Sequence, residues 1–144
     1  MKKFTTTIQV ILAAVKKIGL FAAGVASQRY MTALQDQQEV MADLADIITQ
    51  VFALESALLR ARKLTDAGKS SAAVAAAMTS LLADESMSLV EQAARRVLAT
   101  CGEGDMLRTQ LAILRRLARF TPVDSVALSH TIAKSCVQME RYPL

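Results

Sequence analysis

The chain has one histidine and two cysteines, residue types that often supply a general base, a nucleophile or a metal ligand. His130 lies between Leu128 and Ile132, and no nearby pattern supplies the nucleophile or carboxylate that a catalytic base needs. One histidine and two distant cysteines, Cys101 and Cys136, do not make a recognisable metal site. We therefore interpret His130 as a solvent-exposed or core-edge residue. Both thiols are expected to be free and buried, in a reducing compartment.

Acidic residues offer a second route to chemistry, because paired carboxylates can bind metals. Asp43 and Asp46 would share one face of a helix, but a di-metal site in a helical bundle also needs a Glu-x-x-His motif, which the sequence lacks. We interpret this pair as part of a solvated face. Glu55 interrupts an apolar stripe, and we expect it to pair with an arginine from another helix, either Arg95 or Arg96, in a structural contact.

Two arginine pairs are the strongest electrostatic features of the sequence. Arg95–Arg96 and Arg115–Arg116 could bind anionic lipid headgroups or the phosphates of a coenzyme, but surface or ion-pair roles are the simpler interpretation. No glycine-rich phosphate-binding motif accompanies them. The net charge of +4 is scattered along the chain and there is no tryptophan, which disfavours a nucleic-acid partner. We therefore predict no catalytic, cofactor-binding or metal-binding residue.

The elements that carry these residues are best defined around the stretch from Asp36 to Lys63. Asp36 can accept hydrogen bonds from the first-turn amides, and Glu39 can complete a capping box. A first apolar stripe, predicted to be buried, consists of Val40, Leu44, Ile47, Val51, Leu54, Leu58 and Ala61. A second stripe beside it, which predicts a second packing neighbour, consists of Met41, Ala45, Ile48, Phe52 and Leu59.

The same periodicity predicts four further helices joined by tight turns. They span Thr5–Leu34, Ser71–Cys101, Asp105–Phe120, and a last helix that is capped by Thr121, has Pro122 at its first position and runs to about Met139. Alternating strands and hairpin turns are missing, so the predicted fold class is all-α, an antiparallel helical bundle of about four to five helices. The length predicts a single helical domain over 1–144.

Glycines and other small residues mark the turns and close contacts of this bundle. Gly68 is predicted to end the second helix. Gly19 and Gly24 belong to a small-residue seam in the first helix, which predicts either a close backbone approach or a kink. The first two helices should form a hairpin, unless they fuse into a bent rod. The tail Glu140–Leu144 is expected to be an extended docking strand or disordered.

Apolar residues at helical spacing supply the remaining core candidates. They are Ile8, Ile11, Leu12, Val15, Ile18, Phe21, Ala22 and Val25 in the first helix, Leu89, Val90, Ala93, Val97 and Leu98 in the third, Leu107, Leu111, Leu114 and Leu117 in the fourth, and Val126, Leu128, Ile132, Ala133, Cys136 and Val137 in the last. Lys16 and Lys17 interrupt the apolar segment from Val10 to Ala26, so neither a membrane span nor a signal peptide is predicted there.

Two segments resemble a known family. The run GLFAAGVASQRYMTALQDQQEVMADLADIITQVFALESALLRARK, from Gly19 to Lys63, is similar to the extra C-terminal helical domain of acyl-CoA dehydrogenases of the very-long-chain type and their bacterial relatives. EGDMLRTQLAILRRLARFTPVDSVAL, from Glu103 to Leu128, resembles the end of those chains. The resemblance implies that the flavin site and the catalytic glutamate belong to a preceding dehydrogenase core, so no catalytic residue carries over to this chain.

The resemblance also implies a role and partners. We expect a non-catalytic domain that packs on an FAD-bearing dehydrogenase core, on its own copy or on both, since the predicted apolar faces exceed what five helices can cover. The alternative is an independent helical module at a membrane surface, which would use the lysine pair and the scattered arginines. The expected location is cytoplasmic, or peripheral at the inner membrane face, and not secreted.

Overall fold

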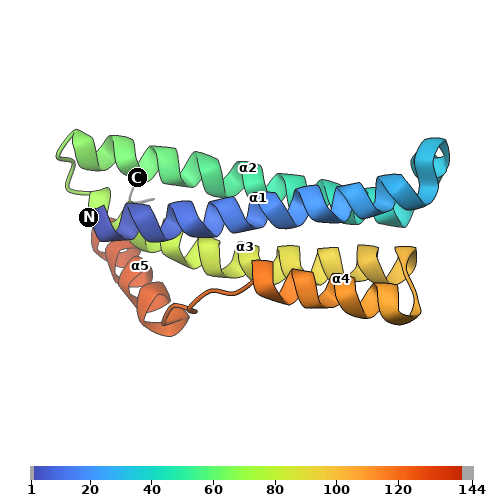
Figure 1. The fold of residues 1–144 in the computed structure, drawn as a ribbon. Coiled ribbons are helices and arrows are strands. Elements are labelled where there is room, and N and C mark those ends of the chain that lie inside the picture. The colour runs from blue at the N-terminus through green and yellow to red at the C-terminus, as the bar shows by residue number, and fades with distance from the viewer. Residues whose placement is uncertain (1, 141–144) are drawn as a thin grey trace.

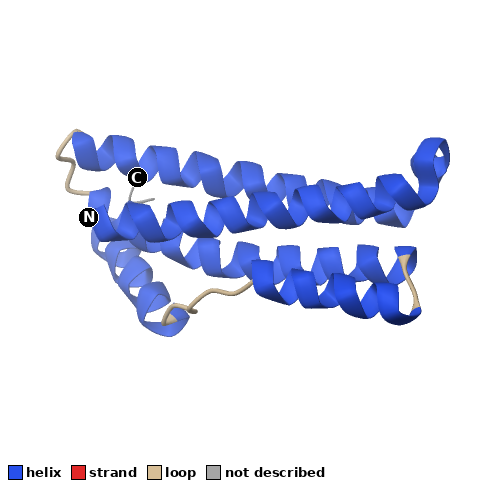
Figure 2. Cartoon of the chain, in the orientation of Figure 1, coloured by secondary structure: helices blue, strands red, loops and turns tan. Residues whose placement is uncertain are grey.

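A computed structural model describes residues 2–140, and this part of the chain is helical without strands (Figures 1 and 2). The elements in order are α1 (Lys2–Tyr30), the short 3-10 helix η1 (Met31–Asp36), α2 (Gln38–Asp66), α3 (Ala72–Cys101), α4 (Gly104–Leu117) and α5 (Ser125–Met139). The predicted all-α bundle is confirmed, with helix boundaries close to those expected for the first four helices. Of the predicted tail, residues 141–144 lie outside the described residues.

Three long helices build the body of the bundle. α1, α2 and α3 have 29 or 30 residues each and pack against one another, which corresponds to rods of about 45 Å. α4 turns back along α3 and also contacts α1 (Figure 1). α5 lies at the opposite end from the turn between α3 and α4, and α3 is its sole helical neighbour in the described chain.

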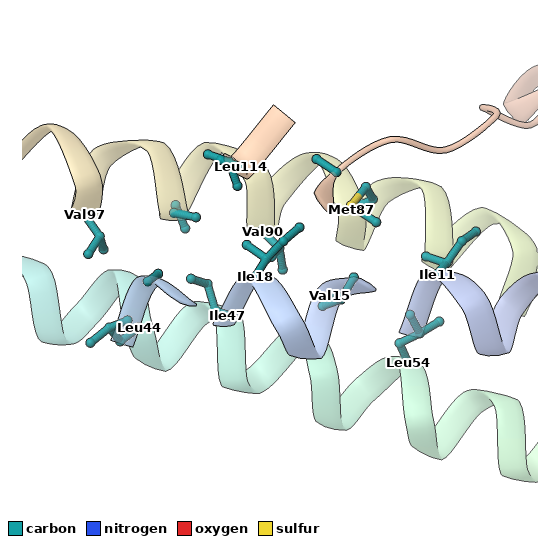
Figure 3. Close-up of a cluster of buried hydrophobic side chains, with 14 of the residues drawn as sticks. Ile11, Val15, Ile18, Leu44, Ile47, Leu54, Met87, Val90, Val97 and Leu114 are labelled. Atoms are coloured by element: carbon teal, nitrogen blue, oxygen red, sulfur yellow. The ribbon is translucent and has the colours of Figure 1, made fainter. Parts of the chain in front are cut away.

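The core runs along the bundle axis between α1, α2 and α3 (Figure 3). The first stripe of α2 is confirmed, because all its members are buried except Val51, which is partly buried. Ile18, Leu54 and Leu98 are completely buried, and Leu114 is the completely buried residue of α4. Helical spacing therefore identified most inward residues of the first four helices, because each of those faces meets a neighbour. The core prediction for Leu89 of α3 is wrong, because this residue is 50% exposed and lines a hollow between α2 and α3 rather than the core.

The start of α2 differs from the prediction. Asp36 does not cap this helix; it is the last residue of η1, and α2 begins at Gln38 after Gln37, which makes no side-chain cap bond. The reversal begins earlier, at Met31, whose φ of 50° turns the chain into η1. The hairpin of α1 and α2 is thus formed as expected, but through a 3-10 turn in place of a capping box.

The start of α5 also differs. Thr121 and Pro122 lie in a non-helical segment, and the helix starts three residues later than predicted, at Ser125. Its cap is Asp124, whose side chain accepts a hydrogen bond from the backbone N–H of Ala127 at 2.9 Å. The segment is tied to α3, because the backbone N–H of Val123 donates to the Asp84 carboxylate at 3.1 Å. This long-range bond holds residues that the local Thr-Pro signal would have placed in a helix.

The core prediction for α5 is partly wrong. Val126, Ala133 and Val137 are exposed, and α5 has no buried residue. Leu128, Ile132 and Cys136 are partly buried. α5 has one helical neighbour rather than two, so only one side of it can be covered.

The small-residue seam of α1 is a close contact at one glycine and not at the other. A Cβ on Gly19 would lie 2.9 Å from Cγ2 of Ile47 in α2, whereas a Cβ on Gly24 would meet nothing within 4 Å. Gly19 therefore lets α1 and α2 approach closely, and no close contact explains Gly24.

These two glycines make a matched pair for mutation. We expect Gly24→Ala to raise the free energy of unfolding by about 0.5–1 kcal/mol, since alanine is the better helix former and the site is open. Gly19→Ala gains the same propensity but pushes against a stiff β-branched side chain, which costs about 1–3 kcal/mol. Urea unfolding of both variants should rank Gly19→Ala below Gly24→Ala; equal stabilities would contradict the close approach.

Two helical segments are long and apolar enough to cross a membrane by length and composition alone. They are Phe4–Asp36 and Ala72–Cys101, and 33% and 39% of the respective apolar windows are buried within the bundle. The first contains the segment for which no membrane span was predicted. Both contribute to the central core in Figure 3, and the core helices of soluble proteins satisfy the same criteria.

Candidate functional site

A stripe of large apolar side chains on α2 faces away from the core. Met41, Ile48, Phe52 and Leu59 are exposed, and Phe52 and Ile48 retain 72% and 68% of their accessible surface. These residues belong to the second apolar stripe, which lies about a quarter turn around the helix from the buried one. The prediction that a second neighbour covers this stripe is not fulfilled by any helix of the described chain.

The contact between α1 and α2 shows which side this stripe occupies. Gly19 packs against Ile47, so these residues lie on the facing sides of two antiparallel helices. The next residue along each helix points about 100° further around the axis of that helix. Because the two helices are antiparallel, these next residues point to the same side of the pair. Leu20, which is 75% exposed, therefore joins Ile48 on one surface. We call Leu20, Met41, Ile48, Phe52 and Leu59 the outer face.

One ion pair fixes the register of the two helices beside the outer face. Nζ of Lys16 donates to the Glu55 carboxylate at 2.8 Å, and both side chains are more than 40% exposed. The predicted partners of Glu55, Arg95 and Arg96, are therefore wrong. Glu55 points toward α1, and a list of charges along the sequence cannot reveal which neighbouring helix an acidic residue faces.

The other flank of α2 is held by polar contacts to α3. Nε of Arg96 donates to the Asp43 carboxylate at 2.9 Å, and the same carboxylate also accepts from the terminal nitrogen Nη2. This hydrogen bond raises the pKa of the Arg96 guanidinium. Ser86 donates to the Gln50 side chain at 2.9 Å. α2 is thus bonded through side chains to α1 and α3, while its outer face offers a partner apolar contacts.

The other residues that could take part in catalysis or metal binding are not brought together. His130 is exposed on α5, and Asp46 lines a hollow of about 250 Å³ between α2 and α3 with Gln50, Gln92 and Arg96. Within residues 2–140, no group of three or more histidine, cysteine or acidic residues could hold a metal ion. The hollow therefore contains an ion-paired arginine and amides, but no recognisable reaction centre.

The cysteines and the arginine pairs have separate environments. Cys101 and Cys136 are both free and only partly buried. Burial raises the pKa of the Cys101 thiol, an effect that the charge of Arg29 partly offsets, and a protonated thiol is a poor nucleophile. Arg95 pairs with Glu91 on its own helix at 2.7 Å, and Arg115 and Arg116 are exposed. No anion-binding cluster is evident among these residues.

Comparison with known proteins gives consistent matches. The family model described as acyl-CoA dehydrogenase, C-terminal domain, matches residues 14–116. The chain is 38% identical over 128 residues to a probable acyl-CoA dehydrogenase of Bacillus subtilis (strain 168), a match that covers 88% of this chain and 22% of the relative.

A solved structure extends this similarity to the fold. The crystal structure of acyl-CoA dehydrogenase complexed with FAD from Bacillus anthracis superposes with a TM-score of 0.90 and 34% identity. The superposition covers 94% of this chain and 23% of that one. The chain therefore spans less than a quarter of the length of either relative.

Proposed function

Because the chain belongs to the family of acyl-CoA dehydrogenase C-terminal domains, we propose that it is a non-catalytic domain that docks on the catalytic part of such an enzyme. By catalytic part we mean the portion of an acyl-CoA dehydrogenase that this chain does not match. That portion makes up most of both relatives, since the matches cover only 22% and 23% of them. It is therefore large enough to supply the surface that a docking domain needs.

The outer face is the observation that carries this proposal. Its five large side chains come from two helices and lie on one side of the α1–α2 pair. Several large apolar side chains on one side of a helix pair are typical of an interaction site, whereas isolated exposed apolar residues are common on any protein. The Lys16–Glu55 ion pair lies beside these apolar side chains and adds a polar contact at the edge of the face.

The energies indicate how such docking would work. Burial of each large side chain contributes about 1.5–3 kcal/mol, and association of two separate proteins costs about 4–15 kcal/mol. The summed contribution of five side chains is therefore of the same order as this cost, which supports modest binding between separate chains. Covalent connection to the catalytic part makes the same contact intramolecular and raises its effective concentration to the millimolar range, which favours stable docking within one polypeptide.

We propose that the catalytic reaction takes place outside this chain. FAD is bound by the Bacillus anthracis relative, and we propose that the parent of this chain binds it through the catalytic part. The isolated histidine, the protonated Cys101 thiol and the dispersed carboxylates support a non-catalytic role. Free cysteines also fit a cytoplasmic location.

The test compares the chain alone with a reconstituted enzyme. We expect the 144-residue chain to retain no FAD on gel filtration and to oxidise no acyl-CoA in a dye-reduction assay, because the residues capable of chemistry lie apart. The separately produced catalytic part should hold FAD and bind the chain. Acyl-CoA oxidation by the chain alone would contradict the proposal.

Membrane association is the rival function, favoured only by the length and hydropathy of Phe4–Asp36 and Ala72–Cys101. Liposome flotation separates the two functions. Docking predicts that the chain stays with the soluble fraction at low and high salt, whereas peripheral binding to anionic lipid would be seen at low salt and lost at high salt.

A further inference from the structure

The uncompensated charges that border the outer face have one sign. Arg62 and Lys63 lie three and four residues after Leu59, and Lys17 lies three residues before Leu20, so each is a neighbour of the face on its own helix. All three side chains are exposed, and none forms an ion pair within the described chain. A partner can therefore pair with all three. We call Lys17, Arg62 and Lys63 the basic rim.

The acidic residues of α2 do not cancel the basic rim. Glu39, Asp43 and Asp46 recur at steps of four and three, so they share the side of α2 on which Asp43 bonds to α3. Glu55 lies beside the outer face but is already neutralised by its ion pair with α1. Asp66 is the last residue of α2 and lies two turns beyond the apolar side chains. The border of the face is therefore positive.

This positive border distinguishes between possible partners. A second copy of the chain would bring the same cations together around the same face, and like charges across an interface disfavour binding. An anionic membrane would attract the rim but would repel the carboxylates of Glu55 and Asp66. A protein surface can place its charges individually, and the part of each relative that this chain does not match is more than three quarters of that protein.

We propose that the surface of the catalytic part that covers the outer face is an apolar patch bordered by carboxylates, which pair with the basic rim. This inference rests on the proposed docking function and adds the chemistry of the partner surface. Around Met41 and Ile48, the positions three and four residues away along the chain carry no charge. Apolar contacts would thus form the centre of the interface and ion pairs its edge, which is the usual arrangement.

The basic rim also gives the docked domain a direction. Arg62 and Lys63 border the end of the face at Leu59, whereas no cation lies within one turn of Met41 at the other end. A partner with carboxylates at one end only is therefore bound in one orientation along α1 and α2. Ion pairs at the edge of an interface act mainly on orientation and association rate, whereas the apolar centre holds the complex together.

Alkylation of position 48 tests the basic rim in the parent enzyme, where the catalytic part and this chain form one polypeptide. Ile48→Cys lies within the outer face, and mass spectrometry of its peptide separates its labelling from that of other cysteines. The labelling rate reports the fraction of molecules in which the domain is undocked. We expect Arg62→Glu combined with Lys63→Glu to accelerate labelling at least tenfold at low salt, because two attractions become repulsions.

Two further variants separate pairing from damage to the end of α2. Lys17→Glu lies in the middle of α1 and should accelerate labelling at least threefold. Arg115→Glu combined with Arg116→Glu reverses two adjacent exposed arginines on α4 and should leave the rate unchanged. Equal acceleration by the rim pair and the α4 pair would indicate a general effect of net charge and would overturn the basic rim.

Salt provides a second criterion. The screening length falls from about 10 Å at 0.1 M salt to about 3 Å at 1 M. Added salt should therefore accelerate labelling of position 48 when the rim is intact, and slow it in the variant with Arg62→Glu and Lys63→Glu. Loss of helix stability alone would not reverse the direction of the salt effect.

The possible failures are distinguishable. Labelling of position 48 as fast in the parent as in the 144-residue chain would contradict docking, and this inference with it. A protected position 48 whose labelling is insensitive to the charge reversals would overturn the basic rim and leave docking intact. The same insensitivity, with loss of binding of the 144-residue chain to phosphatidylglycerol vesicles in the rim variants, would assign the rim to lipid.

Discussion

We expect Leu54→Ala to lower the free energy of unfolding by about 2–5 kcal/mol. Leu54 is completely buried where α2 meets the other long helices (Figure 3), and truncation leaves a cavity that long packed helices cannot easily close. The loss corresponds to a drop in melting temperature of roughly 10 °C for a domain of this size. Thermal and urea unfolding followed by circular dichroism measure both quantities. The single-domain prediction also requires one cooperative transition.

Leu59→Ala is the matched control for this result. It is the same substitution on the same helix, five residues away, but Leu59 is 58% exposed on the outer face. Its effect on the isolated chain should stay within about 0.5 kcal/mol. Equal losses for the two variants would mean that the second stripe of α2 is covered in the isolated chain, which would contradict the outer face as a free surface.

Phe52→Asp should weaken binding of the chain to the catalytic part by about 30-fold or more. Phe52 is a large exposed aromatic residue within the outer face, and aromatic residues at the centre of an interface commonly contribute 2 kcal/mol or more. A carboxylate at that position would also be buried without a partner. The measurement is a calorimetric titration of the catalytic part with the wild-type and variant chains.

Val10→Asp provides the control for the docking experiment. Val10 is 65% exposed on α1, and its helical position points away from both the core and the outer face. The variant should bind the catalytic part as the wild type does, and both variants should retain the wild-type helix content. Equal weakening by Val10→Asp and Phe52→Asp would indicate a general effect of added negative charge and would remove the support for a specific face.

Periodicity alone predicted the body of this fold. The buried stripe of α2 and the inward residues of α1 follow from helical spacing because each of these faces meets another helix in the same chain. The same rule failed for Val126 and Val137, because spacing reports that a face is apolar and does not report whether this chain supplies its partner. Local signals at Asp36 and Thr121 failed where η1 and the Asp84–Val123 bond determine the backbone.

The candidate site was predictable in part. The second stripe of α2 was predicted to pack against a second neighbour, which no helix of the described chain supplies. Leu20 was not predicted to belong to this surface, because its place there depends on the close approach of Gly19 to Ile47. The Lys16–Glu55 pair was missed for the same reason. Such contacts follow from the three-dimensional register of two helices, which one-dimensional charge and hydropathy patterns do not contain.

Protection of position 52 tests docking through the outer face most directly. Phe52→Cys is introduced into the Cys101→Ser, Cys136→Ser background, and its alkylation rate is measured with and without a saturating amount of the catalytic part. Docking through the outer face predicts rapid labelling of the free chain and at least tenfold slower labelling in the complex, while Val10→Cys reacts equally fast in both. An unchanged rate at position 52 in a complex that forms would contradict the account.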